Sequence, residues 1–286
     1  MKKFTRKNII LLLIGILVTV LFCYYQNNAI EVNETTIQSR EVPKQFDNFK
    51  MIQLSDLHGK EFGKEQNNLI RKIKNEKPDI IVFTGDLIDA KHYVKKYSLM
   101  LMGKIVKIAP VYFVTGNHEY WSGKYEGLES KLENLGVKVL KNEGVVLERS
   151  GGKIQLLGID DPANISENEY LTEQERADFN IKKSLLSTNH DIEFKVLLSH
   201  RPELISLYSS YDFDLVLTGH AHGGQIRIPF IGGVIAPNQG VLPKYTSGQY
   251  KMKNTTMIVN RGLGNSIIPQ RILNRPEIVV LTLKSK

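Results

Sequence analysis

Cysteine is nearly missing from this chain of 286 residues. Its single cysteine, Cys23, lies in an apolar stretch close to the N-terminus. The remainder of the chain therefore has no disulfide, no zinc-thiolate site and no cysteine nucleophile. Any metal ion that the protein binds must be held by nitrogen and oxygen ligands.

A strong cluster of positive charge is also lacking. The formal net charge of +8 includes four basic residues near the N-terminus, and residues 1–30 contain no Asp or Glu. The rest of the chain carries a net charge of only +4, without an evident basic cluster. This balance suits mild attraction to an anionic membrane or a phosphate group. It argues against a nucleic-acid partner, which is usually met by a clustered basic face.

The N-terminal segment predicts a membrane anchor. Residues 1–8 form a basic tail, and residues 9–25 contain no charged side chain. At about 1.5 Å per residue, a helix of this length reaches the lower limit for crossing a bilayer. The positive-inside rule places the tail in the cytoplasm, so we expect a single-pass protein of the cell membrane with an extracytoplasmic domain. A cleaved signal peptide is the alternative, since length distinguishes the two only weakly.

The rest of the chain predicts one α/β domain. Residues 26–45 are polar and suit a linker or a short first strand. From residue 46 to residue 286, helix-like stretches alternate with apolar runs that end in polar clusters: "MIQLSDLHG", "IIVFTGDLID", "VYFVTGNHEY", "KVLLSHRPE" and "LVLTGHAHGG". Uniformly apolar runs are typical of strands buried on both faces. Strands that alternate with helices predict an α/β architecture.

The polar residues at the five strand ends share one ligand chemistry. They are Asp56, His58, Asp86, Asp89, Asn117, His118, Glu119, His200, His220 and His222. Because ligand sites in α/β sheets lie beyond the carboxyl ends of the strands, we expect these side chains to converge. Alternate residues of an extended strand face the same way, so each Asp-x-His or His-x-His can present two ligands. Carboxylate, imidazole and amide groups suit Mn²⁺, Fe²⁺ or Zn²⁺.

Each fragment alone would be weak evidence. An isolated Asp-x-His or His-x-His is more often a surface loop, and "TGD" or "TGN" alone indicates a turn. The combination is stronger, because five of the seven histidines fall in these clusters. The sequence therefore predicts a metal site built from several strand ends.

In their order along the chain, "DLH", "GDLID", "GNHE", "SH" and "GHAH" resemble the motifs of the calcineurin-like metallophosphoesterases. The stretches "GHAHGGQIRIP" and "VNRGLGNSIIPQRILNRPEI" further resemble the bacterial membrane-associated YaeI/YkuE-like phosphodiesterase branch. The resemblance implies a four-layer α/β sandwich, with two central mixed β-sheets flanked by helices. It also implies two divalent metal ions that share Asp86. Their ligands would be Asp56, His58, Asp86 and His222 for one ion, and Asp86, Asn117, His200 and His220 for the other.

The same resemblance implies roles for residues beside the metal ligands. His118 would act as a general acid or transition-state stabiliser, and Asp89 would orient it. Independently of the resemblance, Glu119 would either accept a hydrogen bond from a histidine or begin a helix.

Several arginines are candidates for contacts with substrate. Arg201 would contact a phosphate or form a surface pair, and we prefer the surface pair. Arg227, Arg261 and Arg271 lie in the branch-specific stretches and are candidates for binding substrate phosphate, because a guanidinium group matches phosphate geometry.

Together, these features predict a dinuclear-metal-dependent phosphoesterase, acting as a phosphodiesterase or pyrophosphatase at the membrane surface. A metal-activated hydroxide would attack phosphorus. The substrate would be a phosphoester, and a lipid-linked ester is one candidate because the anchor holds the site near the bilayer. A nuclease with the same metal core is one alternative, and it would require a basic groove. A catalytically silent, membrane-tethered binding protein is another, and it would have degraded metal ligands.

Overall fold

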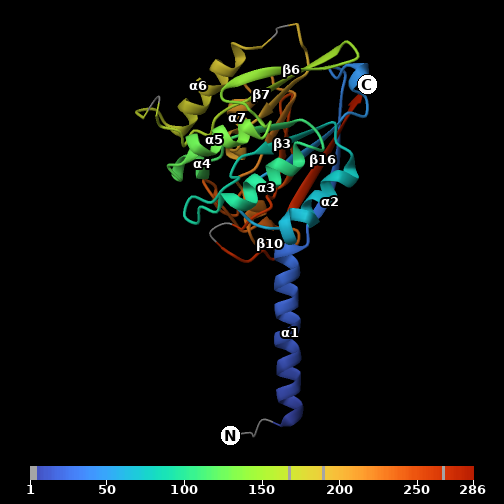
Figure 1. The fold of residues 1–286 in the computed structure, drawn as a ribbon, viewed down its shortest axis with the longest axis vertical. Helices are drawn as coiled ribbons and strands as arrows, with labels where there is room; N and C mark the ends of the chain where they lie inside the picture. Colours follow the sequence, from blue (N-terminus) through green and yellow to red (C-terminus); the bar gives the residue numbers. More distant parts are fainter. Residues whose placement is uncertain (1–4, 167–168, 189–190, 266–267) are drawn as a thin grey trace.

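The computed structural model describes residues 5–166, 169–188, 191–265 and 268–286. The domain contains two six-stranded mixed sheets that pack face to face (Figure 1). The first sheet has the order β1-β16-β2-β3-β4-β5. Its strands are β1 (Glu31–Ser39), β16 (Glu277–Ser285), β2 (Lys50–Leu54), β3 (Ile80–Thr84), β4 (Val111–Val114) and β5 (Lys138–Val139). Within it, β16 runs antiparallel to β2 and parallel to β1.

The second sheet has the order β14-β15-β9-β8-β7-β6. Its strands are β14 (Gly248–Met252), β15 (Thr255–Val259), β9 (Leu215–Thr218), β8 (Lys195–Leu198), β7 (Gly152–Gly158) and β6 (Glu143–Arg149). The inner strands β15, β9, β8 and β7 are parallel, and the two edge strands are antiparallel to their neighbours.

Helices cover the outer face of each sheet. The first sheet is covered by α2 (Asn67–Glu76), α3 (Lys95–Ile105) and α5 (Tyr125–Asn134), and the second by α6 (Glu173–Leu185) and α7 (Ile205–Tyr208). Strand β3 illustrates the layering: Ile81 and Phe83 pack toward the helices, whereas Ile80 and Val82 pack between the sheets. Such strands are apolar on both faces because both faces are covered. The predicted four-layer sandwich is confirmed.

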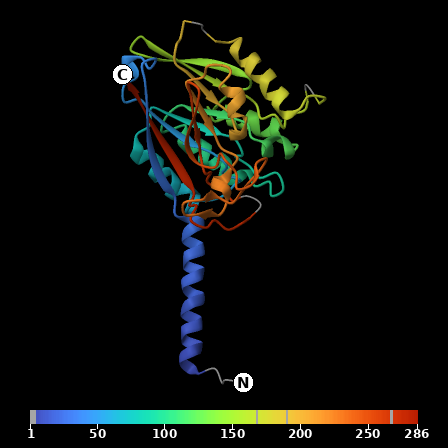
Figure 2. The ribbon, with the colours of Figure 1, turned by 180° about the vertical axis from the view of Figure 1, so that it is seen from behind.

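The N-terminal helix α1 (Arg6–Asn28) projects from one end of the domain, as Figures 1 and 2 both show. It is long and apolar enough to cross a membrane, and its apolar window is not buried against the domain.

Of the two expectations for residues 26–45, a linker or a short first strand, the structure shows the strand. Strand β1 begins at Glu31 and pairs in parallel with β16 over nine positions, from Glu31 to Ser39. The folded domain therefore begins at residue 31 rather than at residue 46. The sequence signal was weak because β1 is an edge strand whose side chains are mostly exposed or half-buried.

Candidate metal centre

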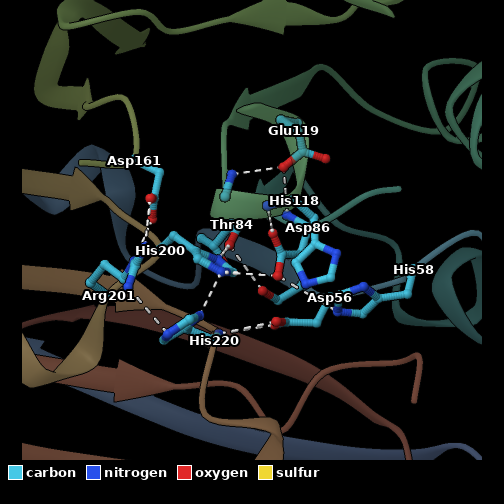
Figure 3. Close-up of polar contacts among 12 residues, drawn as sticks. Asp56, His58, Thr84, Asp86, His118, Glu119, Asp161, His200, Arg201 and His220 are labelled. Atoms are coloured by element: carbon cyan, nitrogen blue, oxygen red, sulfur yellow. Dashed lines mark hydrogen bonds and ion pairs between the residues drawn. The ribbon is translucent and has the colours of Figure 1, made fainter. Parts of the chain in front are cut away.

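The polar strand ends converge at one edge of the sandwich. Three of them follow β2, β3 and β4 of the first sheet, and two follow β8 and β9 of the second. Figure 3 shows side chains from both sheets directed toward Asp86. The carboxyl ends of the two sheets therefore build a shared site, as expected for strands that run parallel within each sheet.

Two groups of possible metal ligands share the carboxylate of Asp86. The first contains Asp56, His58, Asp86 and His222, and the second contains Asp86, His200 and His220. In the first group the Nε2 atoms of His58 and His222 lie 3.1 Å apart. In the second, Nε2 of His200 lies 3.3 Å from Oδ2 of Asp86 and 3.1 Å from Nδ1 of His220. The side chain of Asn117 is buried beside them, at the start of α4 (Asn117–Trp121).

The two ring nitrogens of His200 have different neighbours. Nδ1 faces the Thr84 carbonyl, and Nε2 faces the Asp86 carboxylate. The Thr84 carbonyl lies 2.7 Å from Nδ1 of His200, which therefore carries the proton. In the neutral ring, Nε2 would carry a lone pair facing the Asp86 carboxylate, so this nitrogen either takes up a proton or binds a metal ion. Burial lowers the pKa of His200, but the charge of Asp86 outweighs this effect and raises the pKa to about 10. The space between these acceptors demands a cation, either a proton or a metal ion.

Buried atoms without partners support the same conclusion. Oδ1 of Asn117 has no hydrogen-bond partner among the described residues, and the Nε2 atoms of His58 and His222 face each other and the carboxylates of Asp86 and Asp56. Burial lowers the pKa of His58 to about 4 and the pKa values of His220 and His222 well below their ordinary value. Their rings are therefore neutral and can donate lone pairs to an ion. The donor set fits a pair of divalent metal ions.

The backbone at the site is strained. Five of the candidate ligands have positive φ although they are not glycine: Asp56, His58, Asp86, His220 and His222. Such conformations are costly for residues with a Cβ atom and cluster at functional sites. Tight packing holds them in place, because a Cβ atom on Gly116 would collide with Asp86 and one on Gly219 would collide with Ser55.

Glu119 fixes the loop that carries Asp86. Its carboxylate accepts the backbone N–H groups of Asp86 (2.8 Å), Leu87 (2.9 Å) and Gly116 (2.7 Å). It also stands in the first turn of α4. Glu119 is therefore the helix-start residue of one expectation, whereas its carboxylate accepts backbone N–H groups rather than a histidine. Burial and the nearby charge of Asp86 raise its pKa to about 8.

A pocket of about 360 Å³ opens beside the metal ligands. His118 lines it, and its Nδ1 accepts the N–H of Ala90 at 3.0 Å, which leaves the proton on Nε2. Asp89 also lines the pocket, but its carboxylate is 3.8 Å from Nδ1 of His118. Asp89 instead accepts the N–H groups of Lys91 and His92. It therefore orders the loop that holds His118 rather than bonding to the ring.

Arg201 requires a correction. It is fully buried and forms two hydrogen bonds to Asp161, 2.6 Å from Nε and 2.9 Å from one terminal nitrogen. The expected surface pair is wrong, because the partner Asp161 lies in the interior. Sequence reasoning also missed Asp161 itself. Its signal was present, since Asp160 and Asp161 follow the apolar strand β7 just as the other polar clusters follow their strands.

The structure does not place the other three arginines at the pocket. Arg271 is buried and donates to the carbonyls of Gly264, Arg261 and Asn274. Arg261 pairs with Glu31 and Glu277.

Arg227 is likewise engaged within the protein. It donates to the Gly223 carbonyl at 2.9 Å and to Thr246 Oγ1 at 3.2 Å. Binding of substrate phosphate by Arg227, Arg261 and Arg271 stays a prediction without a supporting contact.

Comparisons with known proteins agree with this geometry. A family model for calcineurin-like phosphoesterases matches residues 49–224. The chain is 34% identical over 267 residues to the uncharacterized metallophosphoesterase YkuE of Bacillus subtilis, covering 92% of this chain and 88% of the relative. It is 30% identical over 266 residues to a transmembrane protein with metallophosphoesterase domain from Bos taurus, covering 89% of this chain and 57% of the relative.

Similarity to a solved structure supports the fold but not the function, because the sequence identity is low. The sulfate thiohydrolase SoxB of Thermus thermophilus superposes with a TM-score of 0.51 at 12% identity, covering 85% of this chain and 57% of that chain. The family match, the relatives and the two ligand groups around Asp86 lead to one conclusion. The chain belongs to the calcineurin-like phosphoesterases, a family of metal-dependent phosphoester hydrolases.

Proposed function

We propose that the protein is a phosphodiesterase or pyrophosphatase that uses two divalent metal ions at the membrane surface. The observation that carries this proposal is the pair of ligand groups that meet at Asp86. Asp56, His58, Asp86 and His222 would hold one ion. The other would be held by Asp86, Asn117, His200 and His220. Nitrogen and oxygen donors favour Mn²⁺, Fe²⁺ or Zn²⁺ at both positions.

Bound ions of this kind polarise phosphoryl oxygens and lower the pKa of a bound water, which provides the nucleophile. The protein supplies the geometry. Glu119 accepts the backbone N–H groups of Asp86 and Leu87 and so fixes the main chain from which the Asp86 carboxylate would reach the ions. Positioning of this type reduces the reorganisation that the reaction requires.

His118 is proposed to act on the leaving group. The Ala90 N–H bonded to Nδ1 fixes the tautomer with its proton on Nε2. That nitrogen can donate to the leaving oxygen as its negative charge develops. Asp89 supports this role indirectly, because it orders the Ala90–His92 turn.

The proposed location is the outer face of the cell membrane. Helix α1 is apolar enough to span, and the basic residues that precede it favour the cytoplasmic side for the N-terminus. A domain held at the bilayer makes a lipid-linked phosphodiester or pyrophosphate a suitable substrate class.

The test is hydrolysis by the full chain in detergent after removal of metal with a chelator. Mn²⁺, Zn²⁺ and Mg²⁺ are added back separately, with bis-p-nitrophenyl phosphate and p-nitrophenyl phosphate as substrates. We expect metal-restored cleavage with a preference for the diester. Faster cleavage of the monoester would overturn the phosphodiesterase assignment. Inactivity of a folded protein with every metal, on these esters and on a lipid-linked pyrophosphate, would overturn the enzymatic proposal.

A further inference from the structure

Two short hairpins carry large apolar side chains into solvent. Strand β10 (Arg227–Ile228) pairs with β11 (Gly232–Gly233), and β12 (Ile235–Ala236) pairs with β13 (Gly240–Val241). We use the name apolar hairpin surface for the exposed side chains of Ile228, Phe230, Ile231, Val241, Leu242 and Leu273. Contiguous exposed apolar patches of this kind mark contacts with a protein or a membrane.

Backbone hydrogen bonds join this surface into one unit. The Leu242 N–H donates to the Val234 carbonyl, and the Val234 N–H donates to the Ile226 carbonyl, each at 2.9 Å. Ile226 in turn forms a β-bridge with Ile272, the neighbour of Leu273. The two hairpins and residues 272–273 are therefore held together by main-chain contacts.

The same unit is fastened to the last turns of α1. The Arg271 N–H donates to Oδ1 of Asn27 at 2.8 Å, and Gln270 donates to the carbonyl of Cys23 at 3.1 Å. Arg275 reaches the Tyr25 hydroxyl at 2.9 Å. Cys23 belongs to the apolar run of the helix, so residues 270–275 reach the level at which the span ends. Figures 1 and 2 both show the β10 region at the end of the domain where α1 enters.

The connection between the N-terminal helix and the folded domain is short. Helix α1 ends at Asn28 and β1 begins at Glu31. The carbonyl of Asn27 also accepts a hydrogen bond from Lys60. With α1 spanning a bilayer as proposed above, a domain tied this closely to its anchor would keep the face around α1 next to the lipid surface.

Charge supports a lipid partner for this face. Residues 215–276 contain no Asp or Glu, although they span a quarter or so of the folded domain. Arg227 and Lys244 lie in or next to the hairpins, whereas Arg271 is buried and Arg261 and Arg275 pair with Glu31. Apolar tips on a segment without carboxylates can enter a bilayer interface without burying an acidic side chain.

We propose that the apolar hairpin surface embeds in the leaflet at which α1 ends. Apolar groups in such a position lie about 5–10 Å deep, at the boundary between head groups and acyl chains. Pro237, between β12 and β13, lines the pocket beside the metal ligands. One wall of the pocket is thereby fixed against the bilayer, with the hairpins as a second attachment besides the helix.

The test uses the full chain with Cys23→Ser, so that each added cysteine is the only one. Phe230→Cys and Leu242→Cys place an environment-sensitive NBD label on the apolar hairpin surface. Glu148→Cys is the matched control, since Glu148 is exposed on β6, far from α1 in Figure 1. Each labelled protein is placed in nanodiscs of phosphatidylcholine and phosphatidylglycerol, with or without nitroxide-bearing lipids.

We expect blue-shifted emission at residues 230 and 242, and loss of most of that fluorescence with nitroxide lipids, whereas the label at residue 148 stays water-like. Water-like emission at both hairpin positions would overturn the proposal. A blue shift without quenching by lipid would also overturn it, because a second protein copy would then cover the surface. No activity is measured, so the result stands apart from the proposed enzymatic function.

Discussion

Two buried charged clusters meet at His220, and they differ in how completely their polar atoms are paired. Around Arg201, both carboxylate oxygens of Asp161 accept hydrogen bonds from the guanidinium group. Around Asp86, imidazole nitrogens face one another and the carboxylates of Asp56 and Asp86, and Oδ1 of Asn117 has no hydrogen-bond partner among the described residues. One terminal nitrogen of Arg201 lies 3.4 Å from Nε2 of His220, which joins the clusters (Figure 3).

The difference separates a structural ion pair from a ligand site. A buried charge pair that satisfies itself has no need of a further ion. A buried group in which imidazole nitrogens and carboxylates face one another is costly until a cation binds between them. Substitutions in the two clusters should therefore affect different quantities, the first stability and the second metal content.

The sharpest test is Asp86→Asn, which removes the shared carboxylate. We expect metal content measured by mass spectrometry to fall, and activity to drop at least about 10³-fold, equal to ~4 kcal/mol of transition-state stabilisation. Glu148→Gln, on the exposed β6 strand, is the control and should keep both. Retention of two ions per chain in Asp86→Asn would contradict the assignment of the Asp86 cluster as a metal site.

His118→Ala should separate catalysis from metal binding. The ring lines the pocket and lies outside the two ligand groups that share Asp86, although it forms a third possible group with His58 and Asp89. We expect turnover to fall about 10²- to 10⁴-fold, the usual contribution of an acid–base group, with metal content unchanged. Loss of metal in this variant would instead assign His118 to the ligand set.

Arg201→Met should reveal the structural cluster. Leaving the Asp161 carboxylate buried and unpaired should lower the free energy of unfolding by about 3–5 kcal/mol. The double variant Arg201→Met with Asp161→Leu should recover much of this loss, as measured by denaturant unfolding of the full chain in detergent. Equal destabilisation of the single and double variants would contradict the paired-charge explanation.

Metal addition gives the smallest expected effect. An ion that binds only the folded chain at 100 times its Kd stabilises it by about 2.7 kcal/mol. Addition of Mn²⁺ to the metal-free protein should therefore raise the unfolding temperature, and Asp86→Asn should abolish this rise. An equal rise in both proteins would mean that Mn²⁺ binds elsewhere.

The local sequence patterns predicted the individual strands better than they predicted which distant strands pair with each other. Uniformly apolar runs identified the buried strands β2, β3, β4, β8 and β9, because burial on both faces leaves a strong compositional signal. The polar residues that follow these runs were identified as candidate ligands, because the carboxyl ends of the strands converge at one edge. Strand β1 was less clear because its partner, β16, lies at the other end of the chain.

The burial of Arg201 is a second feature that local sequence patterns did not predict. Whether an arginine is buried depends on its partner, and Asp161 lies 40 residues away with no periodic relation to it. The exposed tips of the β10–β13 hairpins escape prediction similarly, since a short apolar stretch looks the same in a core and at a surface.

The five candidate ligands with left-handed backbone have a consequence for any evolutionary or laboratory selection. Glycine adopts that conformation without steric cost, so replacing one of these aspartates or histidines by glycine would relieve strain in the metal-free chain. Selection for heat resistance alone, in a medium free of metal, would favour such replacements. The selected proteins would be more stable to heat but would have lost the metal centre. A requirement for the bound ions would therefore oppose the loss of these five side chains.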